Sequence, residues 1–343
     1  MSSKGLVFVT GVSGFVGAHV VHELLQAGYP VRASARPKKV DYVKKGWASY
    51  GDKLEVVPIE DIVNGDFSEA LKGVTAIVHV AAPLALAGDA KHVIGGAVDG
   101  TVNVIRQGYT AGVRKFVLTS TILTALNAKN LGNLSALTNE DWNPSTVEQA
   151  LDGTRDPGFI YSAAKTAAER EVWKFADEHP DVDVTTLNPP LLYGPFAPSF
   201  SAPEPDRGAL STNAYIYGLL SPTGAYPRLP GYADVRDVAR AHVKALSAGP
   251  SSSRKRILIS GEWFNWGEAV KYLLEVHPEL KGRIVDPENA PKAVTGWIVD
   301  LTQSEQVLGL GKEQLTPWKK TVLDAVDALL KLEKEWAAKG LKL

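Results

Sequence analysis

The chain contains no cysteine among its 343 residues, which excludes disulfide bonds, thiolate nucleophiles and cysteine-ligated metal centres. It also lacks an excess of either charge, because 37 Lys and Arg face 38 Asp and Glu. A net charge of −1 gives no whole-protein attraction to nucleic acid or to an anionic membrane. No apolar run approaches the ~18–20 residues that span a bilayer, and the N-terminus lacks the features of a signal peptide. We therefore expect a cytoplasmic protein with neither nucleic-acid nor membrane partners.

Two common classes of catalytic motif are missing as well. None of the seven histidines forms an H-E-x-x-H pair, so no metal site is predicted. No G-x-S-x-G segment supports a hydrolase, and the eight tryptophans are more typical of packing than of nucleic-acid stacking.

The first ~190 residues alternate short β-branched runs with longer amphipathic stretches, a pattern typical of a parallel sheet with crossover helices. This predicts the α/β class, with a doubly wound Rossmann sheet. The predicted strands are Leu6–Thr10, Val31–Ala35, Leu54–Pro58, Ala76–Val80, Lys115–Thr119 and Val182–Leu187. The predicted helices are Phe15–Ala27, Val93–Ala111 and Ile160–Asp177.

The character of the chain changes after Asn188. Residues 189–230 are rich in Pro and Gly, whereas Tyr232–Ala248 resembles a helix and Arg256–Ser260 a strand. The remainder is helical, contains five tryptophans and indicates a smaller, mostly helical substrate-binding lobe. The predicted domains are a dinucleotide-binding unit of residues 1–188 plus about 231–261, and a substrate-binding lobe of residues 189–230 plus about 262–343.

The first motif is a glycine-rich turn, Gly11, Gly14 and Gly17, directly after the first strand. Glycine permits a tight turn and a close approach of backbone to pyrophosphate, and the following helix offers free amides to the phosphates. The alternative is a plain glycine-rich connection. The predicted phosphate-binding residues are Gly11, Ser13, Gly14, Phe15, Val16 and Gly17. The G-x-x-G-x-x-G spacing, with Thr10 and Phe15, resembles the extended short-chain dehydrogenase/reductase family.

The end of the second strand indicates which nicotinamide cofactor fits. An NAD enzyme usually has an acid there that binds the ribose 2′-hydroxyl, but this chain has Arg36, and no acid before Asp41. A guanidinium can bind a 2′-phosphate with two hydrogen bonds. We therefore predict NADPH as cofactor, with Arg36 as the main contact and Lys38 or Lys39 assisting; a solvated basic turn is the alternative.

Tyr161 is the only tyrosine followed by a lysine four positions later, Lys165. On a helix this spacing places both side chains on one face. Free tyrosine titrates near ~10, and a nearby ammonium together with an oxidised nicotinamide should lower that pKa. The pair is therefore a candidate proton-transfer site, the alternative being an exposed Tyr and Lys on an amphipathic helix.

A hydroxyl donor is expected after the fifth strand, in Thr119-Ser120-Thr121. Relatives often have Thr-Ser-Ser there, with the second serine catalytic. The resemblance therefore favours Thr121 as the catalytic hydroxyl, and Ser120 remains a candidate.

Further segments extend the resemblance over most of residues 5–260. They are Asn139-Glu-Asp-Trp-Asn-Pro144, Asn188-Pro-Pro-Leu-Leu-Tyr-Gly-Pro195 and Gly231-Tyr-Ala-Asp-Val-Arg-Asp-Val-Ala239. They resemble fungal carbonyl reductases of the methylglyoxal-reductase and aldehyde-reductase type, with plant dihydroflavonol reductases more distant. Asp99 replaces an Asn of many relatives, which puts a water-relay role there in doubt. The resemblance implies further cofactor contacts at Asp61, Ile62, Ala81, Ala82, Pro189, Leu191 and Leu192.

The resulting hypothesis is NADPH-dependent reduction of neutral ketones and aldehydes, such as ketoesters, diketones and methylglyoxal-like carbonyls. Tyr161 would protonate the alkoxide, Lys165 would orient the nicotinamide ribose, and Thr121 would hold the oxygen, with pro-S hydride transfer implied by the resemblance. The predicted substrate pocket consists of Leu84, Ile122, Leu126, Gly158, Leu191, Tyr193 and Phe196. A nucleotide-sugar epimerase or dehydratase, or a non-catalytic NADP-sensing regulator, are the alternatives. We expect a monomer or weak homodimer.

Overall fold

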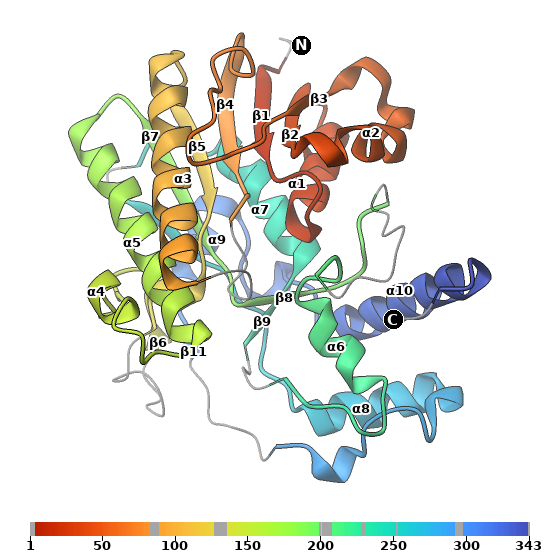
Figure 1. The fold of residues 1–343 in the computed structure, drawn as a ribbon. Coiled ribbons are helices and arrows are strands. Elements are labelled where there is room, and N and C mark those ends of the chain that lie inside the picture. Colours follow the sequence, from red (N-terminus) through yellow and green to blue (C-terminus); the bar gives the residue numbers. More distant parts are fainter. Residues whose placement is uncertain are drawn as a thin grey trace.

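The structure, a computed structural model, describes residues 4–82, 89–126, 136–198, 200, 208–227, 231–251, 253–291 and 298–341. Within these residues a seven-stranded parallel sheet in the order β10-β7-β5-β4-β1-β2-β3 forms the centre (Figure 1). The strands are β1 (Leu6–Thr10), β2 (Val31–Ala35), β3 (Leu54–Pro58), β4 (Val74–His79), β5 (Lys115–Thr119), β7 (Asp183–Asn188) and β10 (Lys255–Leu258). The strand order reverses direction between β1 and β4, where ligands bind in open sheets of this kind. The predicted doubly wound α/β fold is confirmed.

Helices cover both faces of the sheet. On one face α3 (Ala90–Thr110) packs against α5 (Pro157–Glu178), and on the other α1 (Phe15–Gln26) packs against α7 (Val235–Ser247) (Figure 1). The alternation of side chains along β1 shows why, because Phe8 is buried on the face of α3 and α5 whereas Val7 and Val9 are buried on the face of α1 and α7. Both faces are therefore apolar, as a parallel sheet requires.

The predicted boundaries agree well for the strands and less well elsewhere. The four strands β1, β2, β3 and β5 have the predicted bounds, and β4, β7 and β10 are displaced by one or two residues. The predicted helix Tyr232–Ala248 is wrong at its start, because β9 (Tyr232–Asp234) is extended and pairs with β8 (Leu191–Tyr193). The Asp234 side chain accepts a hydrogen bond from the Arg236 amide and so caps α7 only from this point on.

The remaining elements are short or lie in the C-terminal part. They are α2 (Pro37–Gly46), α4 (Val147–Ala150), α6 (Asn213–Leu219), α8 (Trp266–Val276), α9 (Thr302–Leu308), α10 (Trp318–Ala338), β6 (Ala136–Leu137) and β11 (Ile298–Val299), with 3-10 turns at Ala48–Lys53, Ile122–Thr124, Pro278–Leu280, Pro287–Asn289 and Lys312–Gln314. Among the described residues, no helix has the length and apolar character needed to cross a membrane.

The helices α6, α8 and α10 form a second core. Ile216, Val270 and Val326 are fully buried there, together with Tyr193 of β8. In contrast, Leu308, Leu310 and Leu315 pack into the core of the sheet. The C-terminal part of the chain is thus shared between the two cores, whereas the sequence pattern assigns all of it to the lobe.

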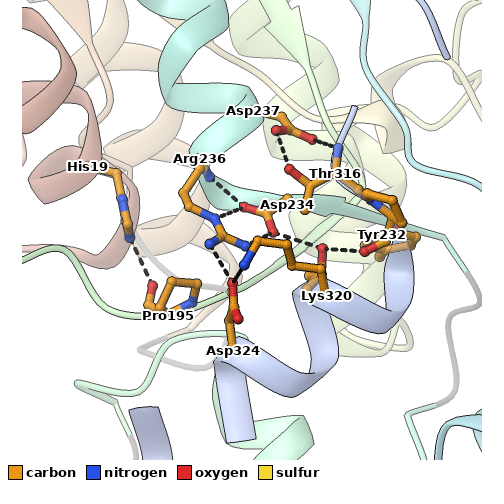
Figure 2. A network of polar contacts seen from close by, with 12 residues as sticks. His19, Pro195, Tyr232, Asp234, Arg236, Asp237, Thr316, Lys320 and Asp324 are labelled. Atoms are coloured by element: carbon orange, nitrogen blue, oxygen red, sulfur yellow. Dashed lines mark hydrogen bonds and ion pairs between the residues drawn. The ribbon is translucent and has the colours of Figure 1, made fainter. Parts of the chain in front are cut away.

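Charged side chains link α10 to β9 and to the start of α7 (Figure 2). Arg236 donates to Asp234 on one side and to Asp324 of α10 on the other, with N–O distances of 2.7 and 2.5 Å. Asp237 accepts from the amide and hydroxyl of Thr316, just before α10, and His19 of α1 contacts the Pro195 carbonyl. These contacts hold β8 and β9, which lie between the two cores, in a fixed position.

Candidate active site

A cavity of about 1020 Å³ lies at the carboxyl ends of the central strands. It is lined by the glycine-rich turn, the ends of β2, β4 and β5, the start of α5, β8, and residues 208–212 of the lobe. Tyr161, Lys165, most of the predicted cofactor contacts and two of the predicted substrate contacts, Ile122 and Leu191, therefore meet around one volume. Such a location is where a doubly wound sheet binds its ligands.

The glycine-rich turn is shaped by steric limits. Gly11 has φ +83°, and a Cβ there would lie 3.0 Å from the Ala81 amide nitrogen. At Gly17 a Cβ would lie 2.1 Å from the Gly11 carbonyl oxygen, so only glycine fits. The helix α1 begins without a side-chain cap on Gly14, which leaves its first amides available to a ligand. This cradle suits a dinucleotide pyrophosphate.

Thr10 joins the turn to the neighbouring strand. Its hydroxyl oxygen accepts from the amides of Val80 and Ala81, each at 3.1 Å, and lies 2.9 Å from Nδ1 of His79. Burial lowers the pKa of His79 to about 3, so this histidine is neutral at physiological pH and part of the core. The segment Ala81–Ala82 is thereby held against Gly11, and both alanines line the cavity.

The basic residues after β2 also line the cavity, as predicted. Arg36 is exposed at the start of α2, and Lys38 and Lys39 share the same wall. These positive charges could bind a phosphate group of a ligand that enters the cavity.

Beside them, the predicted contact at Asp61 has a different environment. Its carboxylate accepts from the Val63 amide and the Asn64 side chain, and hydrogen bonds from Asn64 and then Val63 lower its pKa. Glu60 and Ile62 face the cavity in its place.

Tyr161 and Lys165 both line the cavity, on the same face of α5. This helix begins at Pro157, where Asp156 caps the amides of Gly158 and Phe159. Lys165 is buried, and its ammonium donates to the Thr119 carbonyl at 3.0 Å. The pair therefore lies directly beside the end of β5.

The pKa directions differ from the expectation for the tyrosine. Burial raises the pKa of Tyr161 to about 12, whereas the sequence argument, which included a bound nicotinamide, predicts a decrease. Burial lowers the pKa of Lys165 to about 8, and the negative charge of Glu169 opposes this decrease. In the protein alone, burial is thus the cause of the raised pKa of the tyrosine. Tyr161 is thus a neutral phenol, the form that can donate a proton to an alkoxide.

The hydroxyls of Ser120 and Thr121 differ in their partners. Ser120 donates to the Glu169 carboxylate at 2.5 Å. Thr121 accepts from the Leu123 amide at 3.3 Å, and within the described part of the chain no acceptor is found for its hydroxyl proton. Both residues line the cavity, but only Thr121 has a proton available for a ligand. This supports the prediction that Thr121 holds the substrate oxygen.

The predicted cofactor contacts Pro189, Leu191 and Leu192 lie in the cavity wall, and so does Ile122 of the predicted substrate pocket. Four predicted pocket residues do not. Tyr193 points into the lobe core and meets the Trp266 ring, Leu126 is buried beside Leu137, and Phe196 stacks on Phe200 with ring centroids 4.6 Å apart. Gly158 lies exposed in the first turn of α5. Leu84 lies outside the described residues.

Several wall residues were not predicted from the sequence. They are Ser34, Ala35, Tyr42, Ile59, Glu60, Val80, His92, Leu123, Pro190, Phe200, Gly208, Ala209, Ser211, Thr212 and Gly231. Ser211 has φ +53°, an uncommon backbone conformation for a residue with a side chain. Residues 208–212 lie in the Pro- and Gly-rich segment, where no periodicity indicates which side chains point inward.

The sequence argument also missed a buried ion pair beneath the site. Glu169 and Arg256 are 3% and 2% exposed, and Arg256 Nε donates to Glu169 Oε1 at 2.6 Å. Two signals in the sequence point to it. Glu169 continues the Tyr161–Lys165 spacing by one more turn, and Arg256 begins the otherwise apolar run Arg256–Ile259.

A comparison with protein families matches residues 7–259 to the NAD dependent epimerase/dehydratase family. An oxidoreductase of Schizosaccharomyces pombe, C513.07, is 36% identical over 299 residues, 84% of this chain and 86% of that protein. Aldehyde reductase 2 of Sporidiobolus salmonicolor is 31% identical over 284 residues, 80% of this chain and 81% of that protein.

Among solved structures, the yeast methylglyoxal/isovaleraldehyde reductase Gre2 complexed with NADPH superposes with a TM-score of 0.82. It is 27% identical, and the match covers 96% of this chain and 99% of Gre2. The resemblance to fungal aldehyde and methylglyoxal reductases that the motifs indicate is thereby confirmed.

Proposed function

The chain belongs to the NAD dependent epimerase/dehydratase family, and we propose that within it this protein is an NADPH-dependent carbonyl reductase. One observation carries the proposal: Tyr161, Lys165 and Thr121 line the same cavity as the glycine-rich turn and Arg36. The reductases among its relatives, one of them solved with NADPH, support this assignment.

NADPH, when bound, supplies the hydride to the carbonyl carbon. The glycine-rich turn would hold the pyrophosphate on backbone amides, and Arg36 with its neighbouring lysines would hold the 2′-phosphate. The Lys165 ammonium would donate to the nicotinamide ribose, since it already lies at the end of β5. Held in this way, the cofactor would have its nicotinamide end beside Tyr161.

The protein's own groups then manage the charge on the substrate oxygen. Thr121 donates its available hydroxyl proton to that oxygen, and this hydrogen bond strengthens as the alkoxide develops. Tyr161, a neutral phenol, delivers the proton that completes the alcohol. The positive charge on Lys165 stabilises the resulting phenolate until it is reprotonated.

The wall around the reacting carbonyl favours uncharged substrates. Ile122, Leu191, Phe200 and Ala209 are apolar, and burying a substrate's alkyl group against them is favourable by ~25 cal/mol per Å². None of these four side chains carries a positive charge that could offset the lost hydration of a carboxylate packed against them. We propose neutral ketones, ketoesters, diketones and aldehydes as substrates.

NADPH oxidation measured with matched pairs of carbonyl compounds tests the proposal. We expect a 2-oxo ester to be reduced faster than the corresponding 2-oxo acid, and a neutral aldehyde to be a substrate. No NADPH oxidation with any ketone or aldehyde, combined with turnover of a nucleotide sugar, would establish an epimerase or dehydratase instead. NADPH binding without any turnover would indicate a regulatory protein.

A further inference from the structure

Beneath the proposed active site, Glu169 and Arg256 form an ion pair that the mechanism above does not use. Glu169 lies on α5 one turn beyond Lys165, and Arg256 lies on the edge strand β10. Both are nearly inaccessible to water, with 3% and 2% of their surface exposed.

Every polar atom of the pair has a partner. Arg256 Nη1 donates to the carbonyls of Asn139 and Asp141 at 2.8 and 2.6 Å, and its guanidinium lies 4.0 Å above the Trp142 ring. Glu169 Oε2 lies 2.5 to 2.8 Å from the Ser120, Thr124 and Asn188 side chains.

Stability alone does not account for this arrangement. Removing two charges from water costs about as much as their attraction returns, and a well-packed apolar pair usually stabilises a core equally well. A buried pair with complete hydrogen bonding does, however, fix its neighbours in one geometry. What the pair contributes therefore depends on which neighbouring residues it fixes.

The residues that the ion pair contacts lie next to Thr121. Ser120 precedes it, and Thr124 Oγ1 lies 2.9 Å from the Thr121 carbonyl oxygen and 2.6 Å from Glu169. Asn188 Nδ2 lies 3.3 Å from the same carbonyl oxygen and 2.8 Å from Glu169. The carboxylate thus holds both sides of the backbone that carries the Thr121 hydroxyl.

Glu169 of this pair also acts on the pKa of Lys165. Besides Tyr161 one turn earlier, the titratable groups that face this ammonium in the described residues are Glu169 on α5 and the neutral His79 on β4. Burial lowers the pKa of Lys165, and the charge of Glu169 acts in the opposite direction. Burial likewise raises the pKa of Glu169, but the charge of Arg256 and hydrogen bonds from Ser120 and Thr124 outweigh it and keep the carboxylate ionised.

We propose that Glu169 and Arg256 are positioning residues of the active site. They fix the backbone segment that carries Thr121, and they keep the negative charge of the Glu169 carboxylate near the Lys165 ammonium. This inference rests on the proposed reductase function for the roles of Thr121 and Lys165. The two residues act through their neighbours and touch neither substrate nor cofactor.

The test measures NADPH affinity by fluorescence across pH, for the wild type, Glu169→Gln, Arg256→Met and the double variant. NADPH affinity should fall as the pH rises and the Lys165 ammonium loses its proton. The pH at the midpoint of that fall therefore reports the pKa of Lys165. Glu169→Gln should lower the midpoint by about one pH unit, because the attractive charge is removed and Arg256 is left unpaired. Arg256→Met should raise it, because a repelling charge is removed, and the double variant, which loses both charges, should lie between Glu169→Gln and the wild type.

A purely structural role predicts a different pattern. It would weaken NADPH binding at every pH and move the midpoints of both single variants together, or not at all, and either result would overturn the proposal. Should a single variant not fold by circular dichroism, the double variant decides, because it buries no unpaired charge. A double-variant midpoint displaced as far as that predicted for Glu169→Gln would also overturn the proposal.

Turnover separates this inference from the proposed function. With a neutral 2-oxo ester, Glu169→Gln should lower kcat about tenfold while NADPH affinity below the midpoint stays unchanged, since Thr121 is loosened but Lys165 remains charged. Wild-type protein that binds NADPH but reduces no carbonyl would refute the reductase assignment. Opposite midpoint shifts in that same protein would still support the pair's action on Lys165.

Discussion

Replacing Gly17 by alanine should break the cofactor cradle. The new Cβ would lie 2.1 Å from the Gly11 carbonyl oxygen and 2.7 Å from its carbonyl carbon. These are backbone atoms, so no side-chain rotation can relieve the contact, and either the turn or the start of α1 must move. Overpacking of this kind costs about 1–3 kcal/mol, and we expect Gly17→Ala to be near the upper end. For a chain of this size that corresponds to a fall in Tm of roughly 3–4 °C.

The loss of NADPH binding should be larger than the loss of stability suggests. Moving the turn displaces the amides that would contact the pyrophosphate, and each charge-assisted hydrogen bond contributes about 1.5–3 kcal/mol. We expect Kd for NADPH to rise at least a hundredfold in Gly17→Ala. Fluorescence titration measures the affinity, and thermal unfolding by circular dichroism measures the stability.

Two control substitutions isolate the cause. At Gly14 a Cβ would lie 3.4 Å from the same carbonyl oxygen, and at Gly249 nothing lies within 4 Å. Gly14→Ala should therefore change the free energy of unfolding by no more than about 1 kcal/mol. Gly249→Ala should change neither the stability nor the NADPH affinity. A Gly17→Ala protein with wild-type Tm and wild-type NADPH affinity would show that this reasoning about the turn is wrong.

The remaining predictions concern charge and proton transfer. Arg36→Glu should remove or invert the preference for NADPH over NADH, which we expect to be about 10- to 100-fold in the wild type from kcat/KM with each cofactor; equal use of both by the wild type would contradict the assignment. Tyr161→Phe should bind NADPH almost normally but lose turnover by about 10²–10⁴-fold, and substantial reductase activity would exclude this proton donor. Burial raises the pKa of Asp324, yet hydrogen bonds from Lys320 and Arg236 outweigh it and hold this pKa below its ordinary value. The stabilisation from Asp324 is thus complete above its unfolded pKa and lost as pH falls through the folded one, so Asp324→Asn should lower stability by about 1 kcal/mol at pH 7 and flatten the acid side of a plot of Tm against pH; equal acid dependence in both proteins would exclude this contribution.

The sheet could be predicted because its signal is local. Strands such as Lys115–Thr119 are short apolar runs between turn residues, and a parallel sheet buries both of their faces. The glycine turn and the Tyr161–Lys165 pair are equally local, since a strand, a turn and one helical face define them. Their meeting in one cavity then follows from the topology, which places the ends of the parallel strands on the same edge of the sheet.

The substrate pocket was harder to predict because side-chain direction there depends on tertiary packing. Tyr193 follows Leu192 on a short strand, yet Leu192 lines the cavity whereas Tyr193 is buried in the lobe core. Sequence proximity to a predicted site does not determine which of two neighbours faces it. The pairing of β8 with β9 decides this, and the predicted helix over Tyr232–Ala248 left no strand for that pairing.

The pair of Glu169 and Arg256 shows a further limit. The two residues are 87 positions apart, and each alone has an ordinary explanation as a solvent-exposed charge on a helix or an edge strand. Only the packing of α5 against the sheet, together with residues 139–142 folding over the end of β10, removes both from water. Once they are buried, each charge needs the other to offset its lost hydration, and the hydrogen bonds of Glu169 reach Ser120, Thr124 and Asn188. If Thr121 has the proposed role, the geometry of its hydroxyl depends on a contact between distant segments, which no local pattern around Thr121 contains.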